Sequence, residues 1–147
     1  MKKSRRLSRE FVLKGLYQWR LSDAPVERIG EELREDPQFA KADEAYFDRL
    51  LGGTLAQMDS LEAALVPHLD RPAGELSPIE HSILDLAAFE LLHEPGVPYR
   101  VIINEAVELA KRFGGTDGFK FVNGVLDKLA AEVRADEIRA GRGKASV

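Results

Sequence analysis

The sequence contains no cysteine, and no run of apolar residues approaches the length of a membrane span. Without cysteine, the 147-residue chain can form neither disulfide bonds nor thiolate metal sites, which fits a reducing cytoplasm. A transmembrane helix needs about 20 apolar residues in succession, and the apolar runs here are far shorter. The basic N-terminal segment also lacks the apolar stretch of a secretory signal. We therefore expect a cytoplasmic protein that makes no contact with a membrane.

The formal net charge of −4 hides a strongly basic first segment. Residues 1–20 carry seven cations and one anion, a net charge of +6, whereas residues 21–147 carry a net charge of −10. The basic end offers a local patch to a polyanion, and the acidic remainder discourages unspecific coating of nucleic acid. A solvated basic tail without a partner is the other interpretation of this asymmetry.

Apolar residues recur at helical spacing through most of the chain, and nowhere do they alternate as in a half-buried strand. The pattern predicts helices over residues 8–21, 25–35, 43–65 and 77–93, and two more whose apolar faces span 102–113 and 122–133. We expect an all-α fold in which six or seven helices form one bundle-like domain over residues 1–139. Residues 140–147 are small and polar and are expected to form a disordered tail.

Local signals place several helix ends. Ser77-Pro78-Ile79-Glu80 combines a serine N-cap, a proline at the first helical position and a glutamate at the third. The helix that follows is apolar nearly all round, which is typical of a central core helix. Gly52-Gly53 weakens the long helix over residues 43–65 and is expected to bend it. Thr116 or Asp117 is expected to cap the last helix.

Three arginines near the N-terminus form the first candidate site. If the first helix begins near Ser4, then Arg5, Arg6 and Arg9 lie on an arc of roughly 100° over two turns. Clustered guanidinium groups suit phosphate binding because each is always charged and makes bidentate hydrogen bonds. Arginine-rich segments can also become ordered on RNA. A solvated charged face is the alternative interpretation.

Phe121 is the second candidate. It lies about 100° from the apolar stripe of the last helix, on the side that also holds Asp117, Lys120, Gly124 and Lys128. A phenylalanine flanked by lysines and beside a glycine can serve as a platform for an unpaired base. Burial under a neighbouring helix is the alternative, and the residues alone favour burial.

The sequence favours neither a metal site nor catalysis. Glu90 and His93 form a Glu-x-x-His pair, but di-iron bundles need two such pairs, and His93 sits where it can interact with the last carbonyls of its helix. Glu105 and Glu108 indicate a solvated polar face. The sequence contains no nucleophile elbow, phosphate-binding glycine loop or dinucleotide fingerprint. We therefore expect no metal, no cofactor and no enzymatic activity.

Two segments in the second half of the chain carry a specific resemblance. Residues 97–111, Val-Pro-Tyr-Arg-Val-Ile-Ile-Asn-Glu-Ala-Val-Glu-Leu-Ala-Lys, and residues 119–127, Phe-Lys-Phe-Val-Asn-Gly-Val-Leu-Asp, resemble the signature of the NusB family of transcription antitermination factors. Arg5-Arg6, Arg9-Glu10 and Leu16-Tyr17 resemble the opening helix of that family. The resemblance implies an all-α fold of two packed three-helix bundles with an extra helix.

The same resemblance implies a function. Members of the family bind boxA, a single-stranded leader RNA element of ribosomal RNA operons, as a heterodimer with NusE, a small-subunit ribosomal protein. The complex joins RNA polymerase with other Nus factors and suppresses premature termination. We therefore expect boxA-like RNA, NusE and the antitermination complex of RNA polymerase as partners.

The family's functional positions carry over residue by residue. Those that correspond to its RNA contacts lie at the start of the first helix and at the start of the last one: Arg5, Arg6, Arg9, Asp117, Lys120 and Phe121. Tyr17 and Glu80 correspond to positions at or near the NusE interface. Leu7 and Ser8 interrupt what can be a denser arginine run in the family, so fewer or weaker RNA contacts are expected here.

Two other functions stay open at this point. A NusB-like chain can act as a protein-interaction module, for example as a homodimer that hides the arginine face and binds no RNA. The accessory domain of RNA cytosine methyltransferases also resembles NusB. That function requires a separate catalytic partner, because the 147 residues include no cofactor-binding domain.

Overall fold

Eight α-helices and three short 3-10 helices make up the part of the chain that the structure describes. This computed structural model describes residues 2–145, and of residues 142–145 the backbone alone. The α-helices are α1 Arg5–Leu21, α2 Val26–Arg34, α3 Glu44–Ala56, α4 Met58–Leu65, α5 Pro78–His93, α6 Tyr99–Phe113, α7 Gly118–Val133 and α8 Ala135–Ala145. The 3-10 helices are Pro37–Lys41, Val66–His68 and Ala73–Glu75. The expected all-α class is confirmed, but the expected count of six or seven helices is too low.

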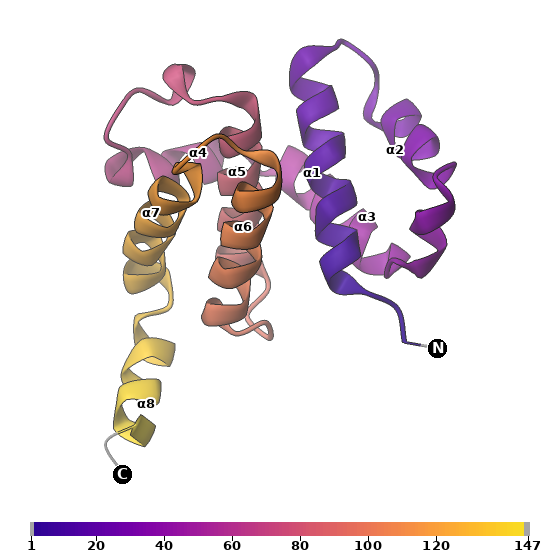
Figure 1. Ribbon diagram of the computed structural model, residues 1–147. Helices are drawn as coiled ribbons and strands as arrows, with labels where there is room; N and C mark the ends of the chain where they lie inside the picture. The colour runs from indigo at the N-terminus through magenta and orange to yellow at the C-terminus, as the bar shows by residue number, and fades with distance from the viewer. Residues whose placement is uncertain (1, 146–147) are drawn as a thin grey trace.

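The helices form two groups of three, and α5 of the second group lies at the centre of the molecule. In the first group α1 packs against α2 and α3, and in the second α5, α6 and α7 pack against one another (Figure 1). Both α1 and α3 also pack on α5, while α4 covers another part of it. Figure 1 shows α6 between α1 and α7, and α8 extending beyond the end of α7. This is the two-bundle arrangement that the sequence resemblance implied.

Serine caps fix the starts of the two helices that meet at the centre. The Ser4 hydroxyl accepts a hydrogen bond from the Leu7 N–H at 3.0 Å, and the Ser77 hydroxyl accepts one from the Glu80 N–H at 3.1 Å. Each hydroxyl satisfies a backbone donor that has no partner within its helix. Every residue from Ser82 to Leu91 is buried, so the prediction that α5 is the central core helix is confirmed.

The break in the long predicted helix over residues 43–65 lies at Gln57 and not at Gly52-Gly53. Gln57 leaves the helical conformation, with φ −105° and ψ 15°, and separates α3 from α4. Gly53 stays helical, and a Cβ there would lie 2.3 Å from the Phe89 ring. The missing side chain at Gly53 therefore lets α3 approach α5 closely, so the predicted bend at this glycine pair is wrong.

The start of α7 also differs from its prediction. Asp117 occupies the N-cap position, as expected, but its backbone is left-handed, with φ 65°, and its side chain does not cap the helix. Aspartate tolerates this conformation better than most residues because its short polar side chain can form local bonds. The Asp117 carboxylate lies 3.3 Å from Lys120 Nζ instead.

Arg134 ties the end of α5 to the start of α8. Its guanidinium donates to the carbonyl oxygens of Leu91 at 2.8 Å, Glu94 at 2.9 Å and Val97 at 3.0 Å. Carbonyls at and just beyond the end of a helix lack partners within it, so a buried arginine that reaches several of them closes that end. Nothing in the local pattern of residues indicated this contact.

Helix α8 bears on the expected division of the chain. The boundary between the domain of residues 1–139 and the tail of residues 140–147 falls inside α8, and residues 146–147 lie outside the described residues. The division stays a prediction. None of the helices described is long and apolar enough to cross a bilayer.

A buried polar network joins the two helix groups. Arg9 of α1 is 4% exposed and donates to the Glu90 carboxylate of α5 at 2.8 and 2.9 Å. The Tyr46 hydroxyl of α3 donates to the same carboxylate at 2.5 Å. Burial lowers the pKa of Arg9, but the hydrogen bonds and charge of Glu90 outweigh this effect and raise it. The network therefore keeps Arg9 charged inside the protein and connects α1, α3 and α5.

Arg9→Ala should destabilise the fold strongly. The substitution leaves Glu90 buried without its countercharge, and removing one member of a buried ion pair costs about 3–5 kcal/mol. Urea denaturation of Arg9→Ala beside Arg6→Ala measures this effect, since the exposed Arg6 should contribute about 1 kcal/mol or less. Equal free energies of unfolding for the two variants would show that the buried pair is not structural.

Candidate nucleic-acid interface

The first turns of α1 present two arginines to solvent and bury the third. The side chain of Arg6 is 73% exposed and that of Arg5 is 50% exposed, whereas that of Arg9 is 5% exposed. The guanidinium of Arg5 lies 4.2 Å from the centre of the Tyr46 ring, which holds it along the surface. Although the three arginines share one arc of α1, the Arg9 side chain points to Glu90 of α5 and is buried. A role for Arg9 in RNA contact stays a prediction.

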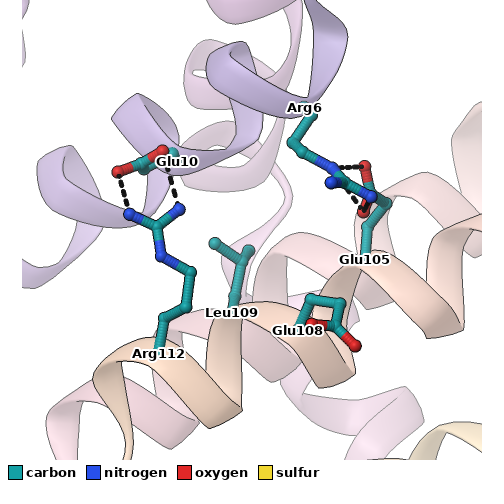
Figure 2. Close-up of a pocket in the computed structure, with 6 residues that line it drawn as sticks. All are labelled: Arg6, Glu10, Glu105, Glu108, Leu109 and Arg112. Atoms are coloured by element: carbon teal, nitrogen blue, oxygen red, sulfur yellow. Dashed lines mark hydrogen bonds and ion pairs between the residues drawn. The ribbon is translucent and has the colours of Figure 1, made fainter.

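Two ion pairs join α1 to α6, one with its arginine on α1 and the other with its arginine on α6. Arg6 of α1 donates through Nε to the Glu105 carboxylate of α6 at 3.0 and 3.1 Å. One turn along, Arg112 of α6 donates to the Glu10 carboxylate of α1 through two nitrogens, each at 3.1 Å. Figure 2 shows Leu109 between the two pairs. Together these residues and Glu108 line a shallow pocket between the helices, which we call the α1/α6 groove.

Glu105 differs from the solvated carboxylate that the sequence indicated. Its side chain is 13% exposed and lies 3.6 Å from Arg9 Nη1, while Arg6 binds it from the solvent side. The hydrogen bonds to Glu105 and its negative charge raise the pKa of Arg6. Neither Glu105 nor the Glu10–Arg112 pair was identified as part of a site from the sequence. The order of charges did not indicate these pairs, because Arg6 and Glu10 are four residues apart whereas Glu105 and Arg112 are seven residues apart.

The second predicted patch forms the start of α7. Asp117 and Lys120 are exposed and pair with each other. Phe121 is partly buried and packs against the core, while the guanidinium of Arg71 lies 4.5 Å from the centre of its ring. Neither alternative for Phe121 holds in full, because its ring packs partly inward and a side chain of the α4–α5 connector covers it. No sequence signal pointed to Arg71.

Helix α6 separates the two predicted RNA patches. Figure 1 shows α6 between the arginine end of α1 and the start of α7. On the α7 side, the Nζ atoms of Lys111 and Lys120 lie 5.2 and 5.9 Å from the centre of the Phe119 ring. A ligand that touches both patches can pass over α6, which carries Lys111 and Arg112 at its exposed surface.

The two residues predicted at a protein interface, Tyr17 and Glu80, differ in their exposure to solvent. Tyr17 is 38% exposed on α1. Glu80 is partly buried, and its carboxylate accepts a hydrogen bond from the Ser77 hydroxyl at 2.6 Å. A Cβ at Gly118 would lie 2.9 Å from Glu80 Oε1, so Glu80 also packs against the start of α7. Tyr17 thus offers a contact surface, whereas Glu80 supports local structure.

A cluster between α4 and α5 has the residue types of a metal site. Nitrogen and oxygen atoms of Glu62, His81 and Asp85 lie within 4.8 Å of one another. Arg20 of α1, however, contacts Asp85 and lies with Nη1 3.2 Å from His81 Nδ1. Because arginine can only donate, Nδ1 must accept, and in neutral histidine Nε2 then carries the proton that Glu62 accepts at 2.5 Å. The arrangement is a hydrogen-bonded network, and the Glu62–His81 bond would have to break for a metal to bind.

The chain matches known proteins over most of its length. The model of the NusB family matches residues 6–131. The chain is 59% identical over 135 residues to the transcription antitermination protein NusB of Thiobacillus denitrificans, covering 92% of this chain and 93% of that protein. It is 54% identical over 142 residues to that of Paraburkholderia phytofirmans, covering 97% and 99%.

Solved structures share the fold. NusB of T. maritima superposes with a TM-score of 0.79 at 34% sequence identity, covering 90% of this chain and 94% of that chain. A chain from the crystal structure of the antitermination factors NusB and NusE in complex with dsRNA superposes with a TM-score of 0.76 at 24% identity, covering 85% and 94%. At that identity the likeness concerns the fold alone.

The network around Asp85 makes stability depend on pH. Burial raises the pKa of Asp85 to about 7, against the opposing charge of Arg20, so the folded protein holds a proton that the unfolded chain releases near pH 4. The contribution of Asp85 to the free energy of unfolding is fully present below about pH 4 and is lost as the pH rises to about 7. We expect the free energy of unfolding of the wild type, relative to Asp85→Asn, to fall by at most about 1.4 kcal/mol per pH unit across that window. A constant difference would show that Arg20 keeps Asp85 ionised throughout.

Proposed function

The chain belongs to the NusB family, and from this premise we propose that it acts in transcription antitermination. It binds boxA-type leader RNA of ribosomal RNA operons together with NusE, and so prevents premature termination by RNA polymerase. The observation that carries the proposal is the match, over 92% of the chain or more, to relatives that are named transcription antitermination proteins. The protein works in the cytoplasm, in the complex of RNA polymerase with other Nus factors, and as a binding protein without a catalytic step.

The surface at the two helix starts supports RNA as the ligand. Arg5 and Arg6 offer exposed guanidinium groups for phosphate, and Phe121 offers a partly buried ring on which a base would replace the Arg71 side chain. Asp117 and Lys120, an exposed ion pair at the start of the same helix, offer polar groups to base edges or phosphate. Phosphate contacts fix position and stacking holds single-stranded bases, so the two patches divide the work of binding an unpaired strand.

NusE is the proposed protein partner. In a solved complex, NusB and NusE are bound together with dsRNA, and the present chain shares the fold of that NusB. We propose that Tyr17 of α1 contacts the partner directly, because its ring is exposed. Glu80 lies near the start of α5, where its carboxylate accepts a hydrogen bond from Ser77. Arg20 of α1 donates to Ser82 of the same helix, so α1 and α5 form one surface here. We propose that Glu80 acts by stabilising the start of α5 next to this surface.

Titration with a boxA-like single-stranded RNA tests the proposal. Binding should be tighter with NusE present, and the logarithm of the association constant should fall with the logarithm of the salt concentration by about 0.7 per phosphate contact. Fluorescence anisotropy at several salt concentrations, with and without NusE, measures both. Absence of RNA binding, together with a homodimer in light scattering that NusE does not displace, would favour the interaction module instead.

Phe121→Ala should weaken RNA binding more than it weakens the fold. Loss of a stacking ring costs about 1–3 kcal/mol of affinity per base. The loss of stability should stay below the roughly 3–5 kcal/mol of a fully buried phenylalanine, because Phe121 is only partly buried. Phe119→Ala is the matched control, since Phe119 is also partly buried and lies on the same helix. Equal loss of affinity in the two variants would contradict a specific role for Phe121.

A further inference from the structure

Glu105 is the charge on which the α1/α6 groove is organised. It binds the exposed Arg6 through two hydrogen bonds and faces the buried Arg9 at 3.6 Å. Its side chain is 13% exposed, so it is held between the two arginines and cannot turn freely into solvent. Figure 2 shows the Arg6 guanidinium lying against this carboxylate.

The groove carries little of the positive charge that its arginines suggest. Glu105 neutralises Arg6, Glu90 neutralises Arg9, and Glu10 neutralises Arg112. Arg6 binds Glu105 through its Nε and Nη2 atoms. These two atoms form one of the edges through which a guanidinium binds phosphate bidentately. In the free protein, the most exposed of the three predicted arginines is therefore already paired.

This pairing matters because an RNA strand that reaches both patches passes over α6. Arg6 belongs to α1, and Phe121 and Lys120 belong to α7, the helices on either side of α6 in Figure 1. When a strand also stacks a base on Phe121, the free energy of that contact helps its phosphate to displace Glu105 from Arg6. A polyanion that makes no such contacts meets Arg6 with its charge cancelled.

We propose that Glu105 limits the affinity of the RNA site: it neutralises Arg6, and an RNA phosphate that binds Arg6 must displace the Glu105 carboxylate. The proposal rests on the RNA-binding function proposed above. The fixed negative charge lowers the affinity for every RNA. The cost of displacing Glu105 from Arg6 is the same for every RNA strand that binds there, so it changes the affinity and not the preference between RNAs.

Glu105→Gln tests the proposal, with Glu108→Gln as its matched control. Both substitutions remove one negative charge from α6, but Glu108 is 54% exposed and pairs with Lys111, not with Arg6. Glu105→Gln should tighten binding to unstructured poly(U) RNA roughly threefold to thirtyfold, as expected when a unit charge a few Å from phosphate is removed. The log–log salt dependence should steepen by about 0.7, the value for one more phosphate contact on a single strand.

Selectivity is the second measurement. The ratio of the dissociation constant for poly(U) to that for boxA-like RNA should stay near the wild-type value in both variants, because both RNAs displace the same carboxylate from Arg6. Equal gains in the two variants would mean that the overall charge of α6 sets affinity, which overturns the proposal. Weaker binding by Glu105→Gln would mean that the carboxylate positions Arg6 for RNA, which overturns it as well.

A double-mutant cycle with Arg6 isolates the pair. Arg6→Ala should reduce affinity more in the Glu105→Gln background than in the wild type, and additive effects would contradict the proposal. Thermal melting confirms that each variant is folded, and the amide that Glu105→Gln introduces can still accept a hydrogen bond from Arg6. Wild-type protein that binds no RNA, even with NusE, rejects the proposed function and this inference together. Wild-type binding with an unchanged Glu105→Gln variant rejects the inference alone.

Discussion

The buried hydrogen-bonded pair of Arg9 and Glu90 is the interaction on which the rest of this structure depends. Two charges in an apolar interior cost free energy, and that cost is offset only when geometry is good and the remaining donors and acceptors are satisfied. Here Arg9 binds Glu90 through two nitrogens, and Tyr46 donates to the same carboxylate. Because the three residues come from α1, α5 and α3, the requirement to satisfy them fixes how the first helix group sits on the central helix.

Two arginines of α1 stay exposed beside that buried pair. Arg9 points toward α5, whereas Arg5 and Arg6, at the start of α1, stay at the surface. Glu105 faces Arg9 from α6 on the inner side and binds Arg6 on the outer side. The buried pair thus continues outward through Glu105 to the exposed arginine, and the stability of the fold and the charge of the binding surface are set by one connected group of residues.

Periodicity and capping predicted most of the fold, because they act within a few residues of sequence. The start of α5 at Ser77-Pro78 and the buried surface around that helix both followed from such local signals. The fate of Gly53 did not, since it depends on the ring of Phe89 from another helix. Arg134 was missed for the same reason, because its carbonyl partners lie about 40 residues away.

The candidate site shows the same division between local and distant causes. Helical phase placed Arg5, Arg6 and Arg9 on one arc, yet phase alone cannot say which part of an arc another helix covers, and Arg9 proved to be buried. Phase also placed Phe121 off the apolar stripe, but the cover that it has comes from Arg71 in a connector. In both cases the side chain's chemistry was visible in the sequence, whereas its partner was set by the packing of helices. A basic residue in such a chain therefore cannot be assigned to RNA until the carboxylate it faces is known.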